Sequence, residues 1–417
     1  MALSARTLVL AATSAMLLAG PAMAQEQRTL TINTDASDPA PKQAFEELVA
    51  AFEAEYPEID VVVNTFDHEG YKTQIRNFLT AEAPDLANWY AGNRMRPYVE
   101  AGLFEPVDDV WEENNLEEQL ASAASAMTMD GHKWGVPYTY YQWGLYTRPD
   151  VLAEHGIEEI ATFDDLVAAC ETLRAAGLTP IALGSKALWP VAGWFDYLNL
   201  RTNGYDFHMQ LTSGEIPFTD ERVRATFENW QRMLDAECFM ENHAAVDWQQ
   251  TIPNFVNGEA PITLMGNFAL APMLEGGLTP EQIDFVQFPV INEEVGMAED
   301  APTDTMHIPA NADNKEDAKT FLAFLARPDV QSQMNATLGQ LPINNQSDVP
   351  EDKFLADGFE MLSNTENLAQ FYDRDTRAEM AKAGMEGFQQ FLVQPEMLDQ
   401  ILERLEQQRQ RIYAAEE

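Results

Sequence analysis

The chain has 417 residues, of which 46% are apolar, so it is long enough to build two buried cores. Its 68 acidic and 25 basic side chains give a formal net charge of −43. Such a negative field repels nucleic acids and anionic lipid surfaces, and both are excluded as expected partners. An acidic surface also suits a salty medium, in which ions screen the repulsion between its charges.

The first 24 residues are typical of a secretory signal peptide. Arg6 supplies a positive charge, residues 7–18 form an apolar stretch, and Ala22 and Ala24 mark a small-residue cleavage site. The mature chain is expected to begin near Gln25, without the cysteine that a lipid anchor would need. No later apolar run is long enough to cross a membrane. The sequence therefore predicts an exported, soluble protein.

A βαβ pattern opens the mature chain. Residues 29–34 alternate as in a strand, residues 45–56 place Phe45, Leu48 and Phe52 on one face of a helix, and residues 59–66 form the next strand. A second helix at about 71–81 and a strand at 84–90 repeat this order. Strands that alternate with helices predict a parallel sheet and a doubly wound α/β lobe.

The later chain predicts a second lobe. Residues 135–146 form a long aromatic strand without a charge, which is expected to pass from one lobe to the other. Residues 162–277 are mostly helical in pattern. Strands follow at 283–290 and 305–309, then a helix that ends at Pro328 and an amphipathic helix over 395–414.

The two cysteines, Cys170 and Cys238, leave their redox state open. No CxxC pair or Cys/His cluster accompanies them, so neither a metal site nor any other cofactor is predicted. Cys170 lies on the apolar stripe of a helix with Leu166 and Leu173, where a small buried thiol fits. A disulfide in an oxidising compartment is the alternative, and the sequence does not decide between the two.

Several catalytic signatures are absent from the sequence. Residues 68–72 lack the second His of an HExxH site, no GxSxG surrounds Ser185, and residues 373–375 do not continue as a calcium loop. Acidic residues are so numerous that a glycosidase-type carboxylate pair stays open, but no pattern indicates one. No catalytic residue is predicted.

Aromatic and polar residues gather at predicted loop positions. Loops that follow parallel strands face the ligand crevice of such a sheet. Sugars present apolar C–H faces and hydroxyl rims, so their sites pair flat aromatic rings with Asp, Asn, Arg and His. A single Trp or Tyr more often belongs to the core, a lone His more often lies on the surface, and Asp35 or Ser37 could equally form a turn or cap a helix, whereas the set indicates a sugar site. The candidates are Asp35, Ser37, His68, Glu69, Asn93, Arg94, Tyr141, Trp189, Trp194, Asp196, Trp248, Asn267, Phe268, Asp304 and His307.

Segments spread over the mature chain resemble, in the family's order, the extracellular solute-binding proteins of ABC sugar importers. This group includes the maltose-binding protein. No single segment is a strict motif, but together behind a signal peptide they are specific. The segments are residues 45–57 (FEELVAAFEAEYP), 84–90 (PDLANWY), 98–109 (YVEAGLFEPVDD), 135–138 (GVPY), 180–183 (PIAL), 258–266 (GEAPITLMG) and 308–318 (IPANADNKEDA).

The resemblance implies two α/β lobes, joined by crossing strands, with the ligand in the cleft between them and no catalysis. The expected division puts residues 25–140 and 292–328 in the N-terminal lobe and residues 141–291 and 329–417 in the C-terminal lobe. Asn93 stands where an Asp is more familiar in the family, and Phe268 stands where a Trp is more familiar. These two departures leave the ligand's identity open.

The function expected from this resemblance is that of a periplasmic, monomeric receptor for a neutral saccharide. It would close on its ligand and deliver it to the membrane permease of an ABC transporter. One alternative keeps the fold but binds a polyol, a charged sugar or a compatible solute, for which Arg94, Arg201 and Arg374 are the cations that an anionic ligand would need. A secreted glycosidase or lyase is the more remote alternative.

Overall fold

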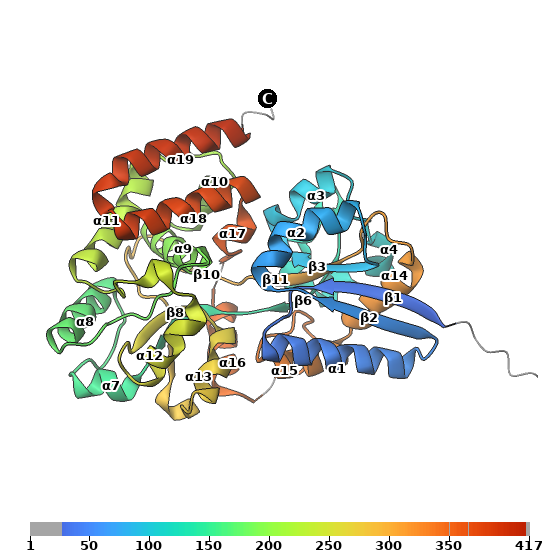
Figure 1. Cartoon of the computed structure of the whole chain (residues 1–417), viewed down its shortest axis with the longest axis horizontal. Coiled ribbons are helices and arrows are strands. Elements are labelled where there is room, and N and C mark those ends of the chain that lie inside the picture. Colours follow the sequence, from blue (N-terminus) through green and yellow to red (C-terminus); the bar gives the residue numbers. More distant parts are fainter. Residues whose placement is uncertain (1–26, 350, 366, 414–417) are drawn as a thin grey trace, which may run out of the picture.

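The computed structural model describes residues 27–349, 351–365 and 367–413. They form two lobes that lie side by side and are joined by segments crossing between them (Figure 1). The predicted signal peptide lies outside the described residues. Among the residues that are described, no helix combines the length and the apolar character that a membrane span requires.

The N-terminal lobe is built on a five-stranded sheet in the order β2-β1-β3-β11-β6. β1 pairs in parallel with β2 and β3, which confirms the βαβ prediction, whereas β11 runs antiparallel between β3 and β6. Because parallel strands end at the same edge of a sheet, the loops after β1, β2 and β3 lie together. The strands are β1 (Arg28–Thr34), β2 (Ile59–Thr65), β3 (Leu86–Tyr90), β6 (Val136–Tyr140) and β11 (Thr303–His307), with a small hairpin of β4 (Thr128–Met129) and β5 (His132–Lys133).

Helices cover both faces of this sheet, with α2 and α3 on one side and α1 and α15 on the other (Figure 1). Phe52 of α1 is fully buried, and its ring lies 4.9 Å from the ring of Phe321 and 5.3 Å from that of Phe324. The helices are α1 (Pro39–Glu55), α2 (His68–Thr80), α3 (Arg96–Glu100), α4 (Asp108–Glu113), α5 (Leu116–Gln119), α6 (Ala121–Ala124), α14 (Lys315–Leu325) and α15 (Pro328–Leu338).

The N-terminal lobe continues beyond its expected boundary at residue 328. Pro328 does end one helix, but it also begins α15, because proline fits the first turn of a helix. α15 lies along α1, and its Val330 and Met334 are buried in the same core as Phe52. Residues 329–338 therefore belong to the N-terminal lobe and not, as expected, to the C-terminal one.

The C-terminal lobe surrounds a three-stranded sheet in the order β8-β7-β9. Its central helix is α9, in which every residue from Pro190 to Arg201 is buried. Phe195 of this helix stacks on Phe388 with ring centroids 4.0 Å apart. The strands are β7 (Trp143–Thr147), β8 (Ile262–Gly266) and β9 (Asp284–Val286), and the helices are α7 (Pro149–Glu154), α8 (Phe163–Ala175), α9 (Trp189–Asn203), α10 (Tyr205–Thr212), α11 (Glu221–Asp235), α12 (Ile252–Val256), α13 (Leu270–Glu275), α16 (Lys353–Ser363), α17 (Tyr372–Asp375), α18 (Ala378–Val393) and α19 (Leu398–Tyr413).

The aromatic segment at 135–146 is two strands and not one. β6 ends at Tyr140 in the N-terminal sheet, and β7 begins at Trp143 in the C-terminal sheet, so Tyr141 and Gln142 cross between the lobes. The chain returns from β10 (Ala298–Asp300) to β11. β10 pairs with β12 (Asn367–Ala369) and contacts α9, whose Arg201 donates a hydrogen bond to the carbonyl of Ala298. Residues 298–300 therefore lie with the C-terminal lobe, not with the N-terminal lobe as expected.

Cys170 of α8 and Cys238, which follows α11, form a disulfide. Both cysteines are fully buried in the C-terminal core, and their Cα atoms lie 5.1 Å apart. The sequence separation of 68 residues spans α9, α10 and α11. The structure therefore decides in favour of the bridged state that the sequence had left open.

Reducing this disulfide is expected to lower the free energy of unfolding by about 2–4 kcal/mol, because the bridge restricts a long loop of the unfolded chain. The measurement compares urea unfolding of the oxidised protein with that of protein refolded under reductant, with free thiols counted in both samples. Equal unfolding midpoints for the fully oxidised and fully reduced samples would contradict this expectation.

Candidate functional site

A cleft of about 550 Å³ lies between the two lobes. This volume is in the range of small-molecule sites. The N-terminal lobe contributes mostly polar groups, and the C-terminal lobe contributes most of the aromatic rings together with polar groups such as Asp247, Asp373 and Arg374. The polar lining from the N-terminal lobe includes Asp35, Ser37, Asp38, Asp67, His68, Glu69 and Asp304, and the aromatic wall opposite includes Tyr141, Trp143, Trp189, Trp248, Phe268 and Phe371.

The aromatic wall is held by edge-to-face packing. The ring of Trp189 lies 6.0 Å from those of Trp143 and Phe268 and 6.3 Å from that of Trp248, at steep interplanar angles. Trp248 and Tyr141 are almost completely buried, whereas Trp189 and Phe268 are only partly buried. Trp189 and Phe268 therefore present ring surface to the cleft, and the buried rings fix their orientation.

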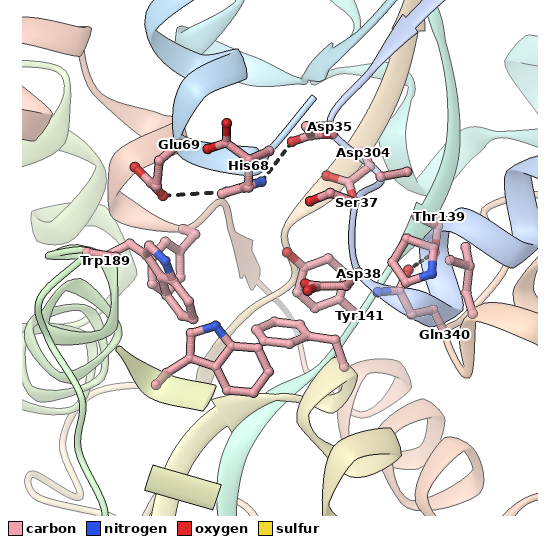
Figure 2. Close-up of a pocket in the computed structure, with 18 of the residues that line it drawn as sticks. Asp35, Ser37, Asp38, His68, Glu69, Thr139, Tyr141, Trp189, Asp304 and Gln340 are labelled. Carbon is pink, nitrogen blue, oxygen red and sulfur yellow. Dashed lines mark hydrogen bonds and ion pairs between the residues drawn. The ribbon is translucent and has the colours of Figure 1, made fainter. Parts of the chain in front are cut away.

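The polar wall follows from the topology of the parallel strands. Asp35 comes directly after β1, and His68 begins the helix that follows β2. The Nδ1 atom of His68 lies 2.8 Å from the Oδ2 atom of Asp35, and Glu69 lies beside the same imidazole (Figure 2). Burial raises the pKa of Asp35, but the hydrogen bond and charge of His68, with the charge of Arg374, outweigh burial and lower that pKa. Asp35 is therefore an ionised acceptor at this wall.

Arg374 of α17 completes the site from a distant part of the chain. Its Nη1 donates to the Oδ1 atom of Asp304 at 2.7 Å, and its guanidinium lies 4.1 Å from the centre of the Tyr90 ring. It also lies 5.8 Å from the ring of Tyr141. An ion pair and two aromatic faces thus engage this cation. Sequence reasoning named Arg374 only as a cation for an anionic ligand, because nothing local connects α17 to β11.

The neighbouring Asp373 also lines the cleft and pairs with Lys72 of α2 at 2.8 Å. Burial raises the pKa of Asp373, but the charges of Lys72, Arg374 and Arg94 outweigh burial and lower it to about 2. The sequence analysis missed other lining residues as well. Asp38 and Asp247 are adjacent to predicted candidates and Thr139 lies in a buried strand, which are signals that could have found them, whereas Gln340 and Phe371 carry no such signal.

Nine of the fifteen candidate residues line the cleft, and their contact with a ligand stays a prediction. Figure 2 shows Asp35, Ser37, His68, Glu69 and Asp304 opposite Trp189, with Tyr141 between the lobes. The nine are Asp35, Ser37, His68, Glu69, Tyr141, Trp189, Trp248, Phe268 and Asp304.

Three further candidates are buried away from the cleft in the C-terminal lobe or at its edge. Trp194 is fully buried and packs edge-to-face on Phe239 at 5.0 Å, because α9 is covered on all sides. The carboxylate of Asp196 accepts the backbone N–H of Tyr372 at 2.8 Å. Asn267 donates to the carbonyl of Gly339. These three side chains are buried in contacts with other parts of the protein, and none of them lines the cleft.

The remaining three candidates are in the N-terminal lobe. Asn93 and Arg94 lie in the single turn η1 (Gly92–Arg94), where the Asn93 amide donates to Asp375 and the Arg94 guanidinium lies 5.9 Å from the Trp89 ring. His307 is fully buried between Thr305 and the carbonyl of Trp134, and burial lowers its pKa to about 4. None of the three lines the cleft. Position after a strand is thus not sufficient to place a side chain in the site.

The described residues include no group of three or more His, Cys, Asp or Glu side chains arranged to hold a metal ion. Several carboxylates of the cleft instead pair with a cation or with the imidazole of His68, as Asp304, Asp373 and Asp35 do. The arrangement suits recognition of a ligand that has an apolar face and a rim of hydrogen-bonding groups.

Residues 35–332 match the family model of the bacterial extracellular solute-binding proteins. The chain belongs to this family. The match spans both lobes and most of the residues that line the cleft. It confirms the family and the binding function that the sequence resemblance implies.

Relatives and a solved structure agree with this assignment. An uncharacterised ABC transporter extracellular-binding protein of Pyrococcus horikoshii is 28% identical over 75% of this chain and 70% of its own length. A probable sugar-binding periplasmic protein of Mesorhizobium japonicum is 24% identical over 72% of this chain and 71% of its own. The crystal structure of a bacterial solute receptor described as exclusive for β-D-galactopyranose superposes with a TM-score of 0.85 and 29% identity, covering 93% of this chain and all of that one. The two-lobed α/β fold is thereby confirmed.

Proposed function

We propose that this solute-binding protein is the periplasmic receptor of an ABC importer for a neutral saccharide. It binds the sugar as a monomer without a cofactor, binds no nucleic acid, catalyses no reaction and delivers the sugar to the membrane permease of its transporter. Family membership supports the receptor role. The sugar-binding names of relatives such as the Mesorhizobium protein support the saccharide.

The observation that carries the proposal is the opposition of two chemically different walls across one cleft. A pyranose ring lies flat on the exposed faces of Trp189 and Phe268, because its C–H groups are apolar. Its hydroxyl groups then face the acceptors and donors around Asp35 and His68. An unpaired buried hydroxyl costs roughly 1–3 kcal/mol, so such a rim selects a ligand that satisfies it. Contacts from both lobes favour the closed arrangement when the ligand is bound.

The charges of the cleft favour a neutral ligand over an acidic one. Within the described part of the chain, Arg374 is the only Lys or Arg that lines the cleft, and Asp304 already pairs with that guanidinium. Asp38, Asp67 and Glu69 add negative charge to the same walls. The carboxylate of a sugar acid would therefore meet like charges without a free cation.

A thermal-shift screen of the purified mature protein tests this proposal. The panel contains neutral mono- and oligosaccharides, including galactose and maltotriose, together with the matched sugar acid galacturonate and a set of polyols. A ligand at about 100 times its dissociation constant stabilises the native state by about 2.7 kcal/mol, which gives a clear shift. We expect a neutral saccharide to raise the melting temperature and its acid counterpart to leave it unchanged.

The second readout is chromatography of the sugar after incubation with the protein. We expect to recover the sugar chemically unchanged. Cleavage products would contradict the proposal that the protein catalyses no reaction. Stabilisation by sugar acids or polyols without any response to neutral saccharides would keep the receptor but contradict its proposed substrate class.

A further inference from the structure

The short helix α17 belongs to the C-terminal lobe but reaches the N-terminal lobe with its polar side chains. Tyr372 is fully buried in the C-terminal core, and its backbone N–H donates to Asp196 of α9. The next three residues each contact a different element of the N-terminal lobe. These contacts are Asp373 with Lys72 of α2 at 2.8 Å, Arg374 with Asp304 of β11 at 2.7 Å, and Asp375 with Asn93 of η1 at 3.3 Å.

Asp375 differs from its neighbours because its partner across the lobes is an amide and not a charge. The carboxyl is almost completely buried, and its Oδ2 atom has no hydrogen-bond partner among the described residues. Burial raises the pKa of Asp375 to about 7, against the smaller opposing effect of the Asn93 hydrogen bonds. Asp373, which pairs with Lys72, has a pKa of about 2. At neutral pH Asp373 is therefore ionised, whereas Asp375 is partly protonated.

Among the described residues, no cation contributes to lowering the pKa of Asp375, on which only burial and the Asn93 hydrogen bonds act. Burial, and then the charge of a neighbouring acid, raises the pKa of Asp196 and of Asp300 well above the ordinary value, which favours their neutral, protonated forms. Glu299 is paired with Arg201. Other charged or titratable groups nearby include Arg94 of η1 and Arg96 of α3, of which Arg96 donates to the Asn93 side chain. They also include Tyr205 and His208 of α10, of which His208 has a pKa lowered to about 3 by burial, and Arg377, which lies 3.9 Å from Glu100 of α3.

We propose that α17 is a proton-dependent strap between the lobes, with the Asp375 carboxyl as the group that senses pH. The protonated carboxyl stabilises the arrangement seen here, in which α17 lies against η1. The ionised carboxylate favours an arrangement in which η1 moves away and water reaches Asp375. Because α17 joins the lobes directly, this pH dependence is expected whichever solute the cleft binds.

The direction of the pH dependence follows from linkage. In the arrangement seen here the pKa of Asp375 is about 7, and in a hydrated arrangement it returns towards 3.8. Asp375 carries its proton in both arrangements well below pH 4 and in neither arrangement well above pH 7. The two arrangements therefore differ in bound protons only between those limits. The equilibrium therefore shifts towards the separated lobes as pH rises, by up to about tenfold per pH unit within this window.

The test measures the distance between the lobes in the ligand-free mature protein. Spin labels at two exposed positions, Glu82 in the N-terminal lobe and Glu241 in the C-terminal lobe, report that distance by pulsed electron resonance from pH 4.5 to pH 8.5. We expect longer distances in the parent protein as pH rises. Asp375→Asn resembles the protonated acid and should keep the low-pH distribution throughout. Asp399→Asn is the control, because the exposed Asp399 pairs with Arg224 within the C-terminal lobe, and it should retain the shift.

An unchanged distance distribution in the parent protein would overturn the proposal. So would a pH shift that persists in Asp375→Asn, since that would assign the titration to another group. A pH shift that is lost equally in Asp399→Asn would overturn it as well. If Asp375→Asn does not fold, infrared difference spectroscopy of the parent protein decides. A protonated carboxyl band that disappears with a midpoint near pH 7, in step with the distance change, supports the strap, and its absence contradicts it.

Discussion

Replacing Trp189 by Ala is expected to weaken saccharide binding by at least about thirtyfold while the protein stays folded. Trp189 begins α9, packs on Trp143, Trp248 and Phe268, and keeps part of its ring exposed to the cleft. Truncation of a central aromatic contact typically costs about 2 kcal/mol or more of binding free energy. Titration calorimetry with the saccharide found by the thermal-shift screen measures the change.

Trp134→Ala is the matched control for Trp189→Ala. Trp134 is also partly buried, but it lies on the N-terminal lobe outside the cleft, where its indole N–H donates to the carbonyl of Met129. We expect unchanged affinity in this variant. Trp189→Phe should recover much of the lost affinity, because a flat ring remains. Equal affinity of Trp189→Ala and the parent protein would show that the aromatic wall is not the sugar platform.

Replacing Arg201 by Met is expected to lower the free energy of unfolding by about 3–5 kcal/mol. Arg201 and Glu299 form an ion pair in the interior of the C-terminal lobe, with side-chain exposures of 1% and 0%. Arg201 also donates to the carbonyls of Phe288 and Ala298, so it ties α9 to β10. Its removal leaves the Glu299 carboxylate buried without its cation, and that desolvation is the main destabilising effect. Urea unfolding measures the change.

Arg224→Met provides the comparison on the surface of the same lobe. Arg224 pairs with Asp399 at 2.6 Å, with side-chain exposures of 43% and 78%. Exposed pairs contribute about 0–1 kcal/mol, so this variant should unfold close to the parent midpoint. The double variant Arg201→Met, Glu299→Gln should regain part of the stability, because no buried charge is left unpaired. Similar losses of unfolding free energy in Arg201→Met and Arg224→Met would contradict the prediction that the buried ion pair matters more for stability than the exposed one.

Elements with strong local patterns could be predicted from the sequence. The alternation in residues 29–34 and the helical face of Phe45, Leu48 and Phe52 are confirmed as β1 and α1, and the order of the first three strands predicted a parallel sheet. Loop position after those strands brought Asp35 and His68 together at one edge. These features follow from periodicity and from strand direction, which are properties of neighbouring residues.

Burial and long-range pairing were decided only by the tertiary structure. Trp189 and Trp194 are five residues apart in one aromatic segment, yet the first faces the cleft and the second is enclosed, because α9 begins at the cleft and runs into the core. The Cys170–Cys238 disulfide and the pairing of Arg374 with Asp304 join residues that are 68 and 70 positions apart. No local pattern specifies such contacts, since they form only when elements distant in sequence pack against one another.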